Sequence, residues 1–166
     1  MIPRTAVGAS SARAATSWTS ACWFAGALPL NVSCTLRPEA GQPAAAAQSF
    51  SVALDFADGS LATVVYGALG ASGLAKEYVE AHCGGRSGVL DDFRSLTLFD
   101  GRKRRTTRGR GSDKGHGAQF AHLRALVAGE AEPESPSGLD TMGVTLAALA
   151  AAASGAAVSI DDRQST

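Results

Sequence analysis

The stretch from Ser49 to Gly70, SFSVALDFADGSLATVVYGALG, constrains the fold more than any other part of this chain. From Phe50 to Phe56, apolar residues alternate with small or acidic ones, which is the two-residue period of a strand with one buried face. Asp58-Gly59 then supplies a dipeptide that tolerates the positive φ of a tight turn. Leu61 to Tyr66 is rich in β-branched and aromatic residues. The stretch therefore predicts an antiparallel hairpin.

Shorter strand patterns flank this hairpin, and two helical patterns follow them. We expect strands at residues 30–36, 77–83, 87–93, 95–99, 102–108 and 156–160, and a short buried helix within residues 21–28. Ser112 or Asp113 can cap a helix over 116–128. Pro136 suits the first turn of a helix over 137–153. The expected apolar stripes are Phe120, Leu123 and Val127 on the first helix, and Leu139, Met142, Leu146 and Leu149 on the second.

A run of strands followed by helices is typical of the α+β class. We predict a mostly antiparallel β-sheet over residues 30–108 with the two C-terminal helices packed on one face. The chain has 166 residues, a length that predicts one domain. Residues 1–20 are rich in Ala, Ser and Thr without a period, and we expect them to be disordered. The predicted domain spans residues 21–160, and residues 161–166 form a tail.

Composition limits the location and the partners. The formal net charge is zero, which argues against a nucleic-acid or anionic-membrane partner. No apolar run reaches the roughly 18 residues of a membrane helix, and Trp18, Trp23 and Pro29 fit a signal peptide poorly. The three cysteines form no CxxC pair and no disulfide framework. A cytoplasmic protein is the expectation.

Several polar patterns are better explained without a site. The glycines of GALGASG (67–73) precede no predicted helix, so a dinucleotide fingerprint is not expected. Asp91-Asp92 would point to opposite faces of a strand. His82, Cys83 and His116 lack zinc-ligand spacing, and we expect no metal. The basic run over 102–114 lacks interleaved aromatics and is best interpreted as a solvated edge strand.

The polar cluster Asp113-Lys114-Gly115-His116 is the candidate substrate-binding site. It lies at a predicted helix start, where free backbone N–H groups and the helix dipole favour an anion or a polar substrate group. The alternative is that Asp113 is a plain helix cap and that Lys114 and His116 are merely exposed. No catalytic and no cofactor-binding residue is predicted.

Four segments taken together resemble a known family. The C-terminal domain of Gfo/Idh/MocA-type oxidoreductases is similar to this chain in the segments NVSCTL, FSVALDFADGSLATVVYGALG, KEYVEAHCGGRSGVLDDFRSLTLFDG and DKGH, which follow one another in this order. The resemblance covers about residues 21–160. It implies an α/β domain that covers the nicotinamide of NAD or NADP, shapes the pocket for a sugar, polyol or related alcohol, and forms oligomer interfaces.

This chain departs from the family pattern in two ways. It shows no N-terminal Rossmann domain with its glycine fingerprint and lysine motif, and it lacks the family's histidine motif, of the form GRIIGEGCHFVDL, before ACWFAGALP. With suitably chosen codons, residues 8–20 read two bases out of frame spell RIIGEGCHFVDL. Our hypothesis is that the first 20 residues are an out-of-frame translation, with Met1 an internal start.

Three functions remain open from the sequence. The chain is favoured as the substrate-side and oligomerisation domain of an NAD(P)-dependent oxidoreductase, inactive on its own. The alternative is a stand-alone dimerisation or docking module, which could bind a separate Rossmann domain. A third interpretation is a phosphate or nucleic-acid binder that uses residues 102–114. We also expect self-association through an exposed sheet face, to which Ala53, Ala62, Val64 and Tyr66 could contribute depending on register.

Overall fold

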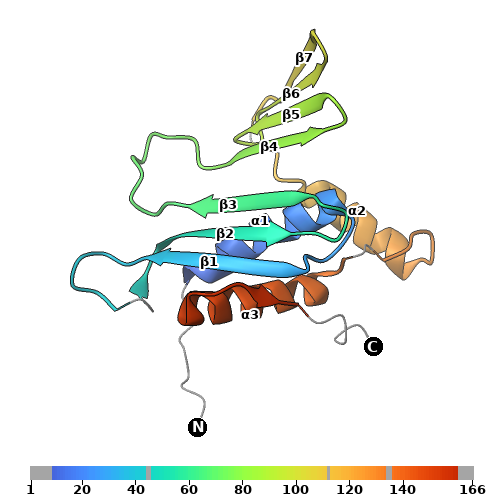
Figure 1. The fold of residues 1–166 in the computed structure, drawn as a ribbon. Coiled ribbons are helices and arrows are strands. Elements are labelled where there is room, and N and C mark those ends of the chain that lie inside the picture. Colours follow the sequence, from blue (N-terminus) through green and yellow to red (C-terminus); the bar gives the residue numbers. More distant parts are fainter. Residues whose placement is uncertain (1–8, 44–45, 112, 134–135, 161–166) are drawn as a thin grey trace. The chain divides into compact units, whose positions relative to one another are not determined.

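The computed structural model describes residues 9–43, 46–111, 113–133 and 136–160. Its elements are α1 (Ala9–Ala25), β1 (Asn31–Arg37), β2 (Ser49–Asp55), β3 (Leu61–Tyr66), β4 (Tyr78–Cys83), β5 (Arg86–Asp91), β6 (Ser95–Asp100), β7 (Lys103–Arg108), α2 (His116–Val127), α3 (Gly138–Ser154) and β8 (Val158–Ser159). They form two compact units, one of residues 1–69 with 133–166 and the other of residues 70–132 (Figure 1). The α+β class with antiparallel strands is confirmed, but the strands form two four-stranded sheets rather than one.

The sheet of the first unit has the order β3-β2-β1-β8, with each neighbouring pair antiparallel. Val52 pairs with Cys34 on one side and with Val64 on the other, and Leu54 pairs with Val32 and Ala62. Paired residues share a face of the sheet. The predicted hairpin and the predicted last strand are therefore both present, and one face of the sheet is apolar.

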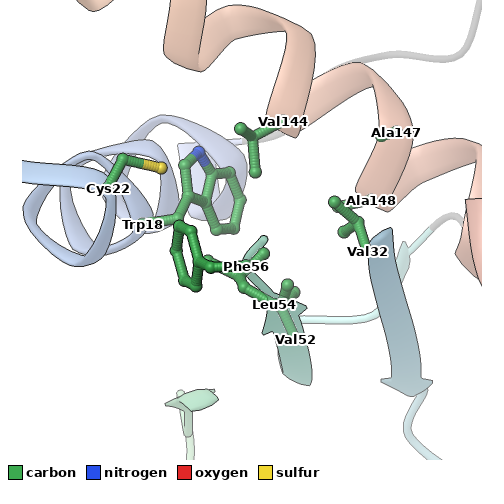
Figure 2. Packing of buried hydrophobic residues seen from close by; sticks show 9 residues of the cluster. All are labelled: Trp18, Cys22, Val32, Val52, Leu54, Phe56, Val144, Ala147 and Ala148. Atoms are coloured by element: carbon green, nitrogen blue, oxygen red, sulfur yellow. The ribbon is translucent and has the colours of Figure 1, made fainter. Parts of the chain in front are cut away.

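The core of this unit lies between that apolar face and two helices. Trp18 and Cys22 of α1, one helical turn apart, pack with Val144, Ala147 and Ala148 of α3 against the strands (Figure 2). The remaining members of the buried cluster are Val32, Val52, Leu54 and Phe56. The small side chains of α3 allow its backbone to lie close to the sheet, where they exclude water together with the larger strand residues.

α3 has the predicted extent but not the predicted orientation. Its buried residues are Thr141, Val144, Thr145, Ala147, Ala148 and Ala151. Leu139, Met142 and Leu146 of the expected stripe are 85%, 55% and 61% exposed, and only Leu149 is half-buried. The helix begins at the cap Ser137, whose hydroxyl accepts from the Asp140 N–H while the Asp140 carboxylate accepts from the Ser137 N–H. Pro136 therefore precedes the cap rather than opening the first turn.

The beginning of the chain also differs from the prediction. Residues 1–8 and the tail 161–166 lie outside the described residues, but α1 already starts at Ala9, inside the segment expected to be disordered. Alanine has the highest intrinsic helix propensity, and a helix does not need an apolar period when a few residues anchor it. Trp18 provides that anchor, with 3% of its surface exposed.

The sheet of the second unit has the order β4-β5-β6-β7. β7 is an edge strand made of basic and threonine residues, as predicted. Along the sheet, Val79, Leu90 and Leu96 form one row and Ala81, Gly88 and Leu98 the next. We call Val79, Ala81, Leu90, Leu96 and Leu98 the Leu98 face. No described residue of this unit is fully buried, so the sheet has no core of its own within the part of the chain that the structure describes.

α2 does not form the predicted packed layer. Phe120, Leu123 and Val127, the expected apolar stripe, are 68%, 53% and 83% exposed, and none of the described residues of this helix is buried. The prediction that both C-terminal helices pack on one face of a sheet is therefore not confirmed. α3 packs on the sheet of the first unit, and α2 has no buried residue among those described.

Candidate functional site

The turn between β5 and β6 has an unusual backbone. Asp92 and Phe93, its two central residues, have φ values of 47° and 54°. The turn is closed by a hydrogen bond from the Arg94 N–H to the Asp91 carbonyl, 2.9 Å long. Glycine or asparagine usually occupies such positions, and positive φ is a genuine outlier for a bulky residue such as phenylalanine. This conformation costs about 1–3 kcal/mol per residue and persists only where surrounding interactions hold it.

The surroundings of the turn do constrain it. The Asp92 N–H donates to the Glu77 carbonyl at 2.7 Å, and the Gly109 N–H donates to the Arg94 carbonyl at 2.8 Å. The Asp92 carboxylate also pairs with the Arg94 guanidinium at 3.0 Å. The turn is thus bound on one side to the residue before β4 and on the other to the residue after β7.

The candidate residue Asp113 is held by the same turn. Its N–H donates to the Phe93 carbonyl at 3.2 Å, and its carboxylate accepts from the Gly115 N–H at 2.8 Å. This second bond closes a small loop just before α2. Asp113 does not cap α2, because the N-cap is Gly115, in the left-handed conformation and with no side-chain cap. Ser112, the other predicted cap, lies outside the described residues.

Lys114 and His116 follow along the same segment. The Lys114 ammonium nitrogen lies 5.9 Å from the centroid of the Phe93 ring, within the range of a cation–π contact. His116 is the first residue of α2 and is exposed. The structure therefore places all three candidate residues in one exposed segment, and it adds Phe93, which the sequence did not single out.

Three parts of the sequence that carry the family resemblance meet here. The hydrogen bonds given above join Glu77 of the KE pair, residues 92–94 of LDDFR and residues 113–116 of DKGH. We call residues 92–94 with 113–116 the turn cluster. Its groups can bind a polar ligand through a cation, an imidazole and backbone N–H groups. Most of them are exposed.

A second polar chain runs over β4 and β5. The Tyr78 hydroxyl donates to Glu80 at 3.0 Å, Glu80 contacts His82 Nε2 at 3.1 Å, and His82 Nδ1 lies 2.8 Å from the Ser87 hydroxyl. The hydrogen bond to the Glu80 carboxylate, followed by burial and the negative charge of Glu80, raises the pKa of Tyr78. The side chains of His82 and Glu80 are 64% and 43% exposed, so water competes for these bonds. Sequence spacing alone indicated only that His82 is no zinc ligand.

The other patterns considered from the sequence have structural roles. Asp91 ends β5 while Asp92 lies in the turn, and the two carboxylates are not a pair. Strand β4 rather than a helix follows the glycines of residues 67–73. Among the described residues, no group of three or more His, Cys, Asp or Glu side chains could hold a metal ion. Nor does any helix in the described ranges have the length and apolarity needed to cross a membrane.

An open hollow of about 390 Å³ lies in the first unit, away from the candidate residues in sequence. It is lined by the end of β1 and the start of β2, and its polar side chains are Arg37, Glu39, Gln48 and Ser49. None of Asp113, Lys114 and His116 contributes to it.

Comparison with solved structures shows where this fold occurs. An NAD-binding oxidoreductase from Klebsiella pneumoniae superposes with a TM-score of 0.69 at 14% identity, over 89% of this chain and 50% of that one. Levoglucosan dehydrogenase in complex with NADH and levoglucosan gives 0.65 at 17% identity, over 86% and 48%. An oxidoreductase from Agrobacterium radiobacter, in complex with NAD+, L-tartaric acid and magnesium, gives 0.62 at 14% identity, over 84% and 46%.

The same fold makes up about half of each of these solved structures. The chain spans about half the length of the solved oxidoreductases that it matches. These structures are of the Gfo/Idh/MocA type, so the fold expected from the resemblance is confirmed, and the half-length match agrees with a C-terminal domain. No protein-family model matches the chain, and no curated protein matches it.

Proposed function

We propose that this chain is the substrate-side and oligomerisation domain of an NAD(P)-dependent oxidoreductase that acts on a sugar, a polyol or a related alcohol. The observation that carries the proposal is the match of most of this chain to half of oxidoreductases that include a sugar dehydrogenase with bound NADH. A resemblance in sequence motifs, found independently of the fold, supports the same family.

The chain on its own has no hydride-transfer activity in this proposal. Hydride transfer requires the reactive carbon of the nicotinamide to be held against the substrate. Dinucleotide-binding folds present the pyrophosphate to a glycine-rich turn between a parallel strand and a helix. Every strand pair that the structure describes is antiparallel. The intact enzyme would bind NAD or NADP in a Rossmann domain, which is one proposed partner of this chain.

The substrate contacts are assigned in this proposal to Asp113, Lys114 and His116. Lys114 and His116 can donate to hydroxyl oxygens, while the Asp113 carboxylate is already engaged with the Gly115 N–H and orders the segment. Three free cysteines, of which Cys83 is exposed, agree with a reducing compartment, and we place the protein in the cytoplasm.

A titration followed by NMR tests this proposal. The ¹⁵N-labelled chain is titrated with levoglucosan, sorbitol and NADH in separate series. We expect a sugar or polyol to shift the backbone amides of residues 113–116 in a saturable way, at millimolar concentration. His116→Ala should abolish these shifts, and His82→Ala, a matched exposed histidine, should not. Saturable NADH binding by the chain alone at micromolar concentration would overturn its assignment as a substrate-side domain.

The second candidate is a stand-alone dimerisation or docking module. The Leu98 face favours it, because Leu96 and Leu98 are 39% and 49% exposed on a sheet without a core of its own among the described residues. Exposed apolar surface of this kind marks interaction sites or aggregation hazards. We propose that a second copy of the chain associates through this face, in either function.

A further inference from the structure

We propose that Phe93 is a positioning residue for the segment Asp113–His116. Its main chain and its ring each make one contact with that segment: the Phe93 carbonyl accepts the Asp113 N–H at 3.2 Å, and the ring lies 5.9 Å from the Lys114 ammonium nitrogen. The inference deepens the proposed function. It rests on that function for one point, that this segment contacts substrate.

The positive φ of Phe93 gives the first reason. A type I′ turn needs positive φ at both central positions, where Asn-Gly, Asp-Gly and Gly-Gly are preferred. This chain has two glycines, Gly84 and Gly85, at φ 56° and 76° in the turn between β4 and β5. At the β5–β6 turn it has a phenylalanine instead, at φ 54°. Hairpin formation does not explain that choice, because glycine would form the same turn at lower cost.

The position of the ring gives the second reason. Phe93 is half-buried although no described residue of its unit is fully buried, so it does not belong to a packed core there. Its ring makes a cation–π contact with Lys114, whose ammonium group lies at the end of a long, flexible side chain. An aromatic face attracts a cation and limits the directions that it can take.

The Asp113 end of the segment is fixed independently of the ring. Its N–H is bound to the Phe93 carbonyl and its carboxylate to the Gly115 N–H. The two anchors lie on either side of Lys114. The turn therefore sets both the path of the main chain into α2 and the direction of the Lys114 side chain.

NMR of the full chain tests the two contacts separately. The signals of the Lys114 Hε protons should be shifted upfield by the ring, relative to those of Lys76 and Lys103, the other two lysines of the chain. Phe93→Leu should return them to the position of the other lysines, and Phe93→Tyr should keep them shifted. Replacing Asp92-Phe93 by Asn-Gly should remove the shift while the Asp113 amide keeps its protection from hydrogen exchange.

The same measurements can overturn the inference. Unshifted Lys114 Hε signals in the wild-type chain, or a shift that survives Phe93→Leu, would show that the ring does not position the lysine. Equal exchange rates at Asp113 and at the exposed Lys114 amide would show that the Phe93 carbonyl does not hold the segment. Neither experiment contains a ligand. Both results can therefore be interpreted even if the chain does not bind the proposed substrate.

Discussion

The indole Nε1 of Trp18 donates a hydrogen bond of 3.2 Å to the hydroxyl of Thr145, joining α1 to α3 across 127 residues of sequence. Both residues are buried, at 3% and 7% exposure. A buried N–H that loses its acceptor retains its full desolvation cost. The bond therefore couples the order of α1 to the presence of α3.

Replacing Thr145 by Val should destabilise the chain by about 1–3 kcal/mol, because the indole N–H is left unsatisfied in the core. Urea denaturation followed by tryptophan fluorescence measures the change. Thr63→Val, the same replacement at an exposed position of β3, should change stability by no more than about 0.5 kcal/mol. Equal effects of the two replacements would mean that α1 does not pack as described.

Replacing Ser137 by Ala should cost about 1 kcal/mol, because the cap of α3 then loses its side-chain acceptor. Ser137→Gly should cost only a few tenths of that amount, since glycine is a tolerated cap. The free energy of unfolding in urea decides the order of the two variants. A Gly variant less stable than the Ala variant would contradict the capping role.

The cap also predicts a dependence on pH. Hydrogen bonds from the side chain and then the main chain of Ser137 lower the pKa of Asp140. Because the pKa in the folded state lies below that in the unfolded state, the stabilisation is present above the unfolded pKa and is lost as pH falls through the folded one. The stability difference between wild type and Asp140→Asn should thus shrink in acid. A difference that is constant down to pH 2 would exclude this linkage.

The three cysteines should react with iodoacetamide at different rates. Burial raises the pKa of Cys22 to about 11 and also raises that of Cys34, whereas Cys83 is exposed. At pH 8 in the folded chain we expect rapid labelling of Cys83, slow labelling of Cys34 and none of Cys22, as measured by mass spectrometry of tryptic peptides. Labelling in urea should make the three rates similar. Rapid reaction of Cys22 without denaturant would contradict its place in the core.

Self-association should weaken when the Leu98 face becomes charged. We expect Leu96→Glu with Leu98→Glu to shift the sedimentation profile toward monomer at micromolar concentration. Thr97→Glu serves as the control, because Thr97 alternates with the two leucines and bonds to Thr106 on the opposite face. A wild-type chain that is already monodisperse and monomeric would remove the association proposal, including its module form.

The sequence predicts the order and approximate bounds of nearly every element, because strand alternation and turn glycines are local signals. It predicts the covered face of β2 but not that of β3. Both faces of β3 are apolar enough to be covered: one carries Ala62, Val64 and Tyr66, and the other carries Leu61 and Val65. Only the pairing of Phe50 with Tyr66 decides which face is covered. That pairing places Ala62, Val64 and Tyr66 on the covered side, so our expectation of them on an exposed face was wrong; Ala53 is exposed as expected.

The rotation of α3 could not be derived from side-chain size. Leucine and methionine form its most apolar stripe, yet the sheet surface accepts the alanine and threonine side, which permits closer approach. For the candidate site, the sequence predicts one polar segment. It cannot predict the turn that holds this segment, since a phenylalanine at positive φ contradicts the statistical preference on which turn prediction depends.

The first unit is assembled from both ends of the chain, with residues 70–132 inserted between its two parts. During synthesis, β1 and the β2–β3 hairpin leave the ribosome long before α3 and β8, which complete their core and pair with β1. Until then, α3 does not pack against Val32, Val52 and Leu54. The nascent chain therefore exposes apolar core residues until α3 has been synthesised, and a product that ends before residue 138 cannot close its core.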